Sequence, residues 1–173
     1  SKYEPAVVSR VYAGNGALLA EFAKEKRVFV PIQSIPPLII EAFLSAEDKN
    51  FFNHIGIDFK ALTKASIRNL KNYNSGKRAL GASTITQQIA KNFLLSSDYS
   101  FERKIKEAIL SLRIERAFSK DHILELYLNE IYLGYGSYGV AAASINYFNK
   151  SLNELSLSEV AYIAALPKGP SNY

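Results

Sequence analysis

The sequence predicts a mainly α-helical domain with a minor β element at its start. From about residue 36 onward, apolar residues recur at helical spacings of three and four. Two capping-box pairs, Thr84 with Gln87 and Ser156 with Glu159, indicate helix starts. Residues 6–30, in contrast, alternate and contain a turn signal, as strands of a hairpin do. With 173 residues, 48% of them hydrophobic and 21% charged, the chain has the composition of one folded domain, which excludes intrinsic disorder.

The β element is expected to be a hairpin. Residues 6–12 and 17–22 flank Ala13-Gly14-Asn15-Gly16, and this Gly-Asn-Gly run favours a tight turn. The short apolar run 28–30 is a candidate third strand.

A first helix is expected after Ser34, which can cap it. Pro36 and Pro37 would lie in its first turn, where a missing N–H group costs nothing. Its buried stripe is predicted to consist of Leu38, Ile39, Ala42, Phe43 and Ala46.

Asp58 is predicted to begin a second helix, which ends near residue 72 and is followed by a loop through 81. The capping box at Thr84 opens a third helix that extends to about residue 95. The remaining helices are expected over a segment that buries Phe101, Ile105, Ala108 and Leu112, after Ser119, over 140–148, and over 160–166 with Pro167 as its stop.

The composition narrows the possible chemistry. There is no cysteine, so disulfides, thiolate catalysis and zinc–sulfur sites are excluded, and two histidines argue against a multi-histidine metal cage. No run of about 18 apolar residues occurs, so no segment of this sequence is expected to span a bilayer. Because the chain also lacks methionine, we expect it to be a fragment of a longer protein.

The net charge of +5 is concentrated in one segment. Residues 58–78 contain six basic residues and one acidic residue, so this segment accounts for the whole excess. Four of the basic residues form one stripe of the predicted helix, at Lys60, Lys64, Arg68 and Lys71. A basic amphipathic helix is typical of contact with a membrane surface or with phosphate, whereas a charged stripe can also be a solvated helix face. Both interpretations remain open from the residues alone.

Two glutamates are candidate catalytic groups. Glu47 shares the side of its helix with Ile39 and Phe43, and a carboxyl beside apolar surface suits a general acid or base. A glutamate at the rim of the core is the alternative. Glu107 lies opposite the predicted apolar stripe of its own helix, paired with Arg103 four residues earlier and close to Lys104. A covered cleft wall and a structural salt bridge explain this pair equally well.

Hydroxyl and amide side chains are concentrated in residues 81–88. Such groups hydrogen-bond sugar hydroxyls or phosphate oxygens, and a helix N-terminus favours anions. The alternative is a well-capped helix with a polar surface. The residues concerned are Ser83, Thr84, Gln87 and Gln88, and Lys91 extends their face.

The remaining motifs favour structural roles. His54 lies in an aromatic turn after Glu47, where a hydrogen-bonded structural histidine is more common than a catalyst. His122 is expected at the surface. The glycine-rich run 134–139 has no preceding strand and matches no nucleotide-binding pattern, so we expect a turn.

Five segments, in order along the chain, resemble the five signatures of the family 51 peptidoglycan glycosyltransferases: residues 47–56, 81–88, 103–107, 120–129 and 139–148. The first runs Glu-Asp-Lys-Asn-Phe-Phe-Asn-His-Ile-Gly from Glu47 to Gly56. The hairpin at the start and the Ala-Ala-Leu-Pro run at 164–167 are similar to the glycosyltransferase module of a class A penicillin-binding protein. A monofunctional transglycosylase is the near alternative.

The resemblance implies a lysozyme-like glycosyltransferase fold with a large helical lobe and a small membrane-facing jaw. It implies that the chain polymerises lipid II into β-1,4-linked glycan strands and releases undecaprenyl pyrophosphate. Glu47 would match the general base that deprotonates the acceptor hydroxyl. Glu107 would match the second glutamate, which positions or stabilises the reacting groups.

The resemblance also implies binding roles. Lys91, Arg103 and Lys104 would neutralise the pyrophosphate of the donor, and stabilising such a leaving group is a large catalytic term. Residues 58–80 would form the jaw, touching the membrane through the basic stripe. The other substrate-binding residues would be Asp48, Ser83, Thr84, Gln87 and Gln88. One position departs from the pattern, because many relatives carry Arg or Lys where this chain has Tyr99.

The expected partners are lipid II, the growing glycan chain and an anionic membrane surface. A C-terminal transpeptidase domain is expected in the full-length protein, and no nucleic acid. The sequence requires no cofactor; a divalent cation, Mg²⁺ or Mn²⁺, is compatible with the family, but no ligand set is visible. The expected location is the extracytoplasmic face of the bacterial cytoplasmic membrane.

Two rival functions remain open. A lysozyme-type peptidoglycan hydrolase would use a similar glutamate beside an apolar wall, but would release reducing sugar from finished peptidoglycan. A non-enzymatic nucleic-acid or membrane-binding module would explain the basic helix, and binding to nucleic acid would depend steeply on salt. This second rival leaves Glu47, Glu107 and the glutamine pair unexplained.

Overall fold

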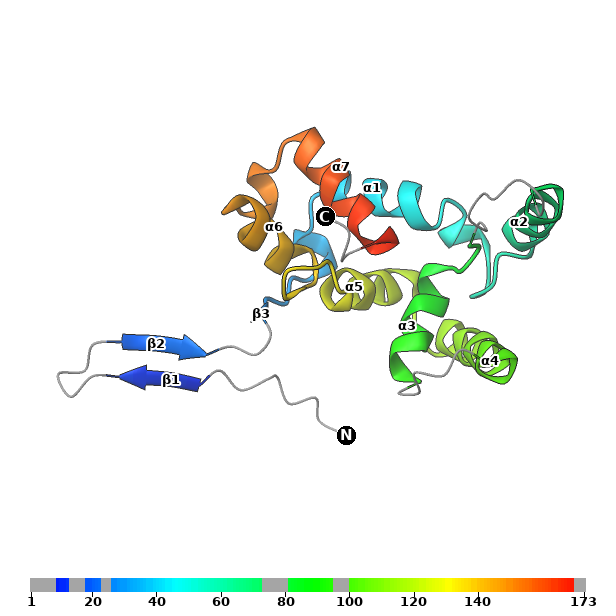
Figure 1. The fold of residues 1–173 in the computed structure, drawn as a ribbon, viewed down its shortest axis with the longest axis horizontal. Helices are drawn as coiled ribbons and strands as arrows, with labels where there is room; N and C mark the ends of the chain where they lie inside the picture. Colours follow the sequence, from blue (N-terminus) through cyan, green and yellow to red (C-terminus); the bar gives the residue numbers. More distant parts are fainter. Residues whose placement is uncertain (1–8, 13–17, 23–25, 73–80, 95–99, 170–173) are drawn as a thin grey trace. The chain divides into compact units, whose positions relative to one another are not determined.

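The computed structural model describes residues 9–12, 18–22, 26–72, 81–94 and 100–169 (Figure 1). Helices dominate these ranges, which confirms the mainly α prediction. The helices and strands are β1 (Ser9–Tyr12), β2 (Leu18–Phe22), β3 (Lys26–Arg27), α1 (Pro37–Glu47), α2 (Phe59–Lys71), α3 (Ile85–Phe93), α4 (Phe101–Ala117), α5 (Lys120–Glu130), β4 (Ser137–Tyr138), α6 (Val140–Phe148) and α7 (Leu157–Ala165). No helix in this described part of the chain is both long and apolar enough to cross a membrane.

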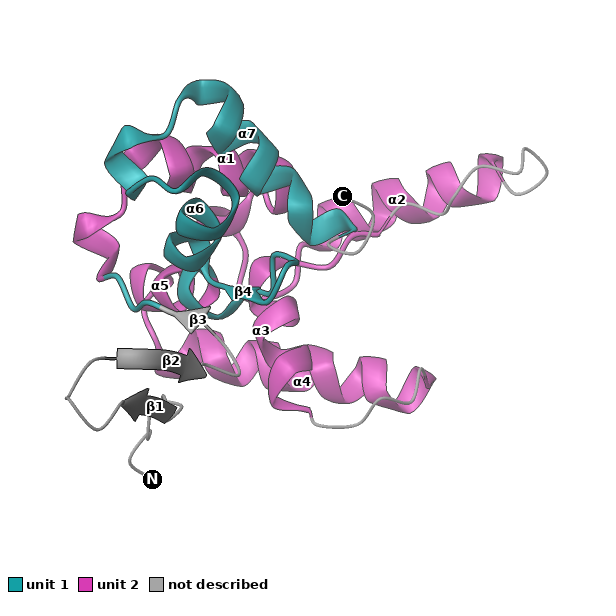
Figure 2. Cartoon of the chain, turned by 60° about the vertical axis from the view of Figure 1, so that its left-hand side comes forward, with its two compact units in different colours: residues 1–30, 128–173 teal, residues 31–127 magenta. Residues whose placement is uncertain are grey.

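The chain divides into two compact units (Figure 2). The first unit consists of residues 1–30 and 128–173, and the second of residues 31–127. The expected division into a large lobe and a small jaw is a different partition and stays a prediction. All of the geometry below lies within one unit or the other.

In the first unit, β1 and β2 pair antiparallel, which confirms the hairpin; its turn lies outside the described residues. The third strand is at 26–27 rather than 28–30, and it pairs in parallel with β4. The reason lies in Asn129, whose side chain binds both backbone groups of Val30, at 2.7 and 2.9 Å, and so removes them from any ladder. The apolar run alone does not reveal this contact.

The two helices at the end of the first unit begin where the sequence indicates. Helix α6 covers Val140–Phe148 and buries its small residues from Val140 to Ser144. Helix α7 covers Leu157–Ala165 rather than 160–166, because it begins directly after Ser156 of the predicted capping box, and Pro167 lies in the short 3₁₀ turn that follows it.

In the second unit, α1 begins later than expected. Ser34 ends a 3₁₀ turn, and the residue before the helix is Pro36. A residue that precedes proline avoids the helical region, so Ile35 and Pro36 are both extended and Pro37 is the first residue free to be helical. Of the predicted stripe, Ile39 and Phe43 are buried, whereas Leu38 is 41% exposed.

Helix α4 is rotated relative to the prediction. The expected core residues Phe101 and Ile105 are 83% and 46% exposed, whereas Glu107, Ser111 and Ile114 are buried. The helix has two apolar stripes, and packing against α3 selects the one that contains Glu107 (Figures 1 and 2). Periodicity alone cannot make that choice, because a satisfied polar residue can stand in a buried stripe.

Candidate active site

Glu47 is the last residue of α1, and its two carboxylate oxygens have different surroundings. Its Oε2 accepts a hydrogen bond from Gln88 Nε2 of α3 at 2.9 Å. Its Oε1 is buried and has no hydrogen-bond partner among the described residues. Because buried polar atoms are normally satisfied, this oxygen is available to a hydroxyl donor from a ligand.

Asp48 joins the end of α1 to the start of α3. Its Oδ2 accepts from His54 Nε2 at 2.9 Å and from the backbone N–H of Ile85, the first residue of α3, at 3.0 Å. A carboxylate at a helix N-terminus is favoured by the helix dipole. Nδ1 of His54 accepts from the N–H of Gly56 at 3.0 Å, which assigns the ring proton to Nε2. His54 therefore has the structural role that the sequence favoured.

Thr84 and Gln87 form the predicted capping box of α3 and are both buried. The Thr84 hydroxyl accepts from the N–H of Gln87 and donates to the carbonyl of Gly56 at 2.6 Å. At Gly56, φ is +101° and a Cβ would lie 2.8 Å from the Ser111 carbonyl oxygen, so glycine is required there. Thr84, one of these two expected substrate contacts, thus holds the loop after α1 in place.

A half-buried ion pair supports the same loop. Glu115 Oε1 accepts from Thr86 Oγ1 at 2.6 Å and from Lys120 Nζ at 2.7 Å. The Lys120 ammonium also lies 4.4 Å from the ring centroid of Phe51, a cation–π distance. Sequence reasoning missed Glu115 and Lys120, because they lie on two different helices, α4 and the start of α5.

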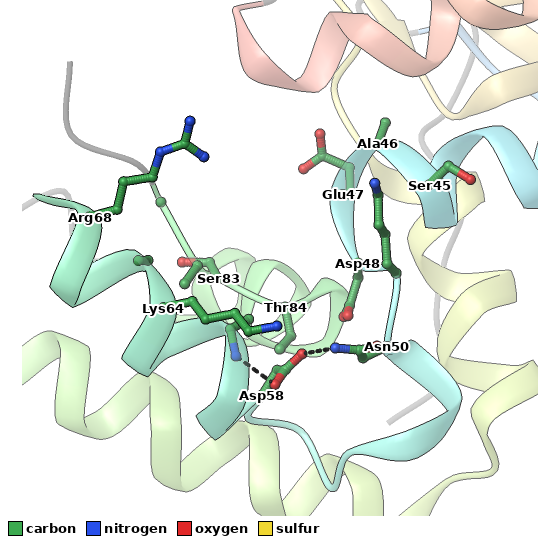
Figure 3. Close-up of a pocket in the computed structure, with 15 residues that line it drawn as sticks. Ser45, Ala46, Glu47, Asp48, Asn50, Asp58, Lys64, Arg68, Ser83 and Thr84 are labelled. Atoms are coloured by element: carbon green, nitrogen blue, oxygen red, sulfur yellow. Dashed lines mark hydrogen bonds between the residues drawn. The ribbon is translucent and has the colours of Figure 1, made fainter. Parts of the chain in front are cut away.

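A cavity of about 430 Å³ opens beside Glu47 (Figure 3). One wall is the face of α2 that carries Lys64 and Arg68, and the small residues Ala61 and Ala65 complete that face at helical spacing. The lining consists of Ser45, Ala46, Glu47, Asp48, Lys49, Asn50, Asp58, Ala61, Lys64, Ala65, Arg68, Gly81, Ala82, Ser83 and Thr84. The predicted basic stripe is therefore divided, because Lys60 and Lys71 are not in this lining.

Two of the carboxylates that line the cavity are hydrogen-bonded within the protein, whereas Glu47 and the cations face the cavity. The backbone N–H of Ala61, and after it the side chain of Asn50, lower the pKa of Asp58, whose two oxygens they bind at 2.9 and 2.7 Å. Asp58 caps α2, and Asp48 is bound as described above, so both carboxylates serve the fold. Lys64 and Arg68 extend from α2 into the cavity that Glu47 faces (Figure 3). The cavity thus presents cations and one carboxylate to a ligand.

Glu107 is buried on α4, as a covered carboxylate was expected to be. The structure pairs Glu107 with Lys104 at 2.5 Å, and the pair with Arg103 that the spacing indicated stays a prediction. The same ammonium donates to Ser83 Oγ at 3.0 Å. Because Ser83 lines the cavity, one hydrogen bond and one ion pair connect Glu107 to it.

The other expected phosphate ligands lie elsewhere in the second unit. Lys91 is exposed in the last turn of α3, and Arg103 is half-buried near the start of α4. Neither residue is in the described lining of the cavity. Tyr99 is outside the described residues.

Residues that line the cavity and that sequence reasoning missed include Lys49, Asn50 and Ala61. Ala61 and Ala65 at i and i+4 beside the basic stripe were a usable signal for an inward face. Within the described ranges, no group of three or more histidine or acidic side chains is arranged to hold a metal ion. The divalent cation therefore stays an expectation from the resemblance.

Known proteins are similar to almost the whole of this chain. The sequence model of the family described as Transglycosylase matches residues 15–173. Penicillin-binding protein 1A of Rickettsia felis is 57% identical over 171 residues, 99% of this chain and 22% of the relative. The protein of the same name from Aquifex aeolicus is 50% identical, over 99% of this chain and 23% of the relative. A crystal structure of penicillin-binding protein 1A from Haemophilus influenzae is 30% identical with a TM-score of 0.49, covering 98% of this chain and 15% of that one.

The chain belongs to the transglycosylase family, as its five signatures indicated. It spans about a fifth of the length of these two relatives.

Proposed function

We propose that this chain is a peptidoglycan glycosyltransferase that elongates β-1,4-linked glycan strands from lipid II and releases undecaprenyl pyrophosphate. The observation that carries the proposal is the carboxylate of Glu47, which has one oxygen fixed by Gln88 and one buried oxygen without a partner beside a cationic cavity. Membership in the transglycosylase family supports it.

Glu47 acts as the general base. The acceptor hydroxyl gives its proton to Oε1 while its oxygen forms the new bond to the anomeric carbon of the donor. The bond from that carbon to the pyrophosphate oxygen breaks, and the electron pair leaves with the pyrophosphate. A general base in such a position contributes about 10²- to 10⁴-fold to the rate.

The cations divide between the two substrates. Lys64 and Arg68 line the cavity beside Glu47 and bind phosphate there. Lys91, Arg103 and Lys104 neutralise the departing pyrophosphate of the donor. Glu107 holds the Lys104 ammonium toward Ser83, so that Glu107 acts by placing charge rather than by taking a proton.

The surface of α2 away from the cavity lies on the membrane. No residue of α2 is buried, and its apolar residues are 47–78% exposed: Phe59, Leu62, Ile67 and Leu70. An exposed apolar helix face of this kind indicates contact with a partner that covers it. Lys60 and Lys71 would meet anionic headgroups, each contributing about 1 kcal/mol. The full-length protein would sit at the extracytoplasmic face of the bacterial cytoplasmic membrane, with a transpeptidase domain following this one.

The test of the reaction class uses the full-length protein with labelled lipid II and, separately, with finished peptidoglycan. We expect lipid II to be converted into long glycan strands and finished peptidoglycan to stay intact. Release of reducing sugar from peptidoglycan without consumption of lipid II would establish a hydrolase instead.

The division of the basic stripe is tested by two charge-matched double variants. Replacing Lys64 and Arg68 by Gln should weaken lipid II binding in detergent by roughly 10- to 100-fold for each cation, because charge-assisted hydrogen bonds are lost. Replacing Lys60 and Lys71 by Gln should spare that binding and reduce attachment to anionic vesicles. The reverse pattern would place the substrate on the other side of α2.

A further inference from the structure

Tyr127 of α5 is linked to the proposed base through Gln88, and the mechanism above gives it no role. It is 2% exposed, and its hydroxyl donates to Gln88 Oε1 at 3.2 Å. The other end of the same amide, Gln88 Nε2, donates to Glu47 Oε2 at 2.9 Å. The three side chains therefore form one hydrogen-bonded series that ends at the carboxylate.

The ring of Tyr127 is fixed as firmly as its hydroxyl. It packs edge-on against Phe43, with ring centroids 6.2 Å apart at 77°. Phe43 stands one turn before Glu47 on α1, so α5 supports α1 at the turn that carries the base. A rigid ring gives the hydroxyl a defined position.

The direction of the series is determined by chemistry. A glutamine amide can lie in either of two orientations, which exchange its oxygen and its nitrogen. Only one orientation presents N–H to the Glu47 carboxylate, since the other would set oxygen against oxygen. Burial, and after it the negative charges of Glu47 and Asp48, raise the pKa of Tyr127 well above its usual value. The phenol therefore stays protonated and remains a donor to the amide oxygen.

We propose that Tyr127 is a positioning residue for glycosyl transfer, which locks the Gln88 amide so that Glu47 keeps Oε2 bound and Oε1 free for the acceptor hydroxyl. This inference rests on the proposed function. Tyr127 takes no proton and touches no reacting atom. Its effect reaches the reaction only through Gln88.

The test begins with Tyr127→Phe in the full-length protein, which removes one oxygen and keeps the ring. We expect kcat for lipid II polymerisation to fall by up to about tenfold, the size of one net hydrogen bond, while KM stays unchanged. The matched control is Tyr147→Phe, whose hydroxyl donates to the Leu133 carbonyl at 2.9 Å in the other unit. That variant should keep the parental kcat.

A double-mutant cycle with Gln88→Ala separates positioning from packing. If Tyr127 acts through Gln88, Tyr127→Phe lowers kcat in the parent and has no further effect in the Gln88→Ala background. The unfolding temperatures of the same four proteins report the contact without any assay of activity, and we expect non-additivity there too. An unchanged kcat in Tyr127→Phe, or additive losses of kcat in the cycle, would overturn the proposal.

The two proposals fail in different ways. If the parent protein does not elongate lipid II, the proposed function is wrong and the role of Tyr127 in it falls as well, whatever the unfolding temperatures show. If the parent elongates lipid II and only the cycle is additive, the proposed function stands and Tyr127 is a packing residue.

Discussion

Two capping boxes in the described part of the chain, those that begin α3 and α7, share one sequence signature but have different surroundings. At the start of α7, Ser156 and Glu159 bind each other's backbone N–H groups at the surface. Lys150 Nζ lies 2.7 Å from the Glu159 carboxylate. That hydrogen bond, followed by the one from the N–H of Ser156, lowers the pKa of Glu159 to about 2. This box begins a helix and, among the described residues, is bonded to another segment of the chain only through Lys150.

At the start of α3, the box of Thr84 and Gln87 is buried and serves a second purpose. The Thr84 hydroxyl also binds the carbonyl of Gly56, and the first N–H of the helix is given to Asp48. The box thus ties α3 to the loop that follows Glu47. A capping-box signature thus predicts where a helix begins, whereas tertiary packing decides how many other segments are bonded to that helix start.

The largest contrast is expected from removing each hydroxyl. Thr84→Ala loses a cap, worth about 1 kcal/mol, and leaves the buried Gly56 carbonyl without a donor, which costs about 1–3 kcal/mol. Ser156→Ala loses only the cap, about 1 kcal/mol. Denaturant unfolding measures both changes, and lipid II turnover should fall in Thr84→Ala alone.

Thr84→Ser is the control, because it keeps the hydroxyl and should restore most of both properties. Equal destabilisation by the two alanine variants, with equal turnover, would mean that the buried box is no more than a helix start.

A smaller contrast between the two capping boxes is expected in how their contributions to stability depend on pH. The pKa of Glu159 is lower in the folded protein than its ordinary 4.5, so its contribution to stability is present above about pH 4.5. That contribution is lost as pH falls from about 4.5 to about 2. Scanning calorimetry from pH 6 to 2 should show the parent and Glu159→Gln converging toward pH 2.

The buried box uses the neutral Gln87 where the exposed box uses a glutamate, which suits the cost of burying charge. Gln87→Leu should therefore differ from the parent by the same amount at every pH in that scan. A Glu159→Gln difference that stays constant with pH would contradict the assigned ion pair.

The difference between local sequence signals and tertiary packing also explains how much of the fold could be predicted. The starts of α2, α3 and α7 follow from local chemistry, such as the Asp58 side chain that accepts from Ala61. The register of α4 and the position of β3 depend on partners far away in the sequence, namely α3 and Ser137–Tyr138. No periodicity in the sequence contains that information.

The candidate site shows a similar division. Glu47 and Gln88 were singled out from the sequence and are hydrogen-bonded in the structure. The cavity-facing position of Lys64 and Arg68 required the placement of α2, because the charge pattern alone left contact with a membrane or phosphate and a solvated helix face open. Tyr127 was not singled out from the sequence, because its contact with Gln88 joins two helices.

The most direct test of the account is the turnover of lipid II by Glu47→Gln, measured together with lipid II binding and beside Glu41→Gln, an exposed glutamate of the same helix. The account predicts a folded Glu47→Gln protein that binds lipid II but polymerises it about 10²- to 10⁴-fold more slowly or worse, and a Glu41→Gln protein with parental turnover. Near-parental polymerisation by the folded Glu47→Gln protein would contradict the account, because the base would then have to be a different group.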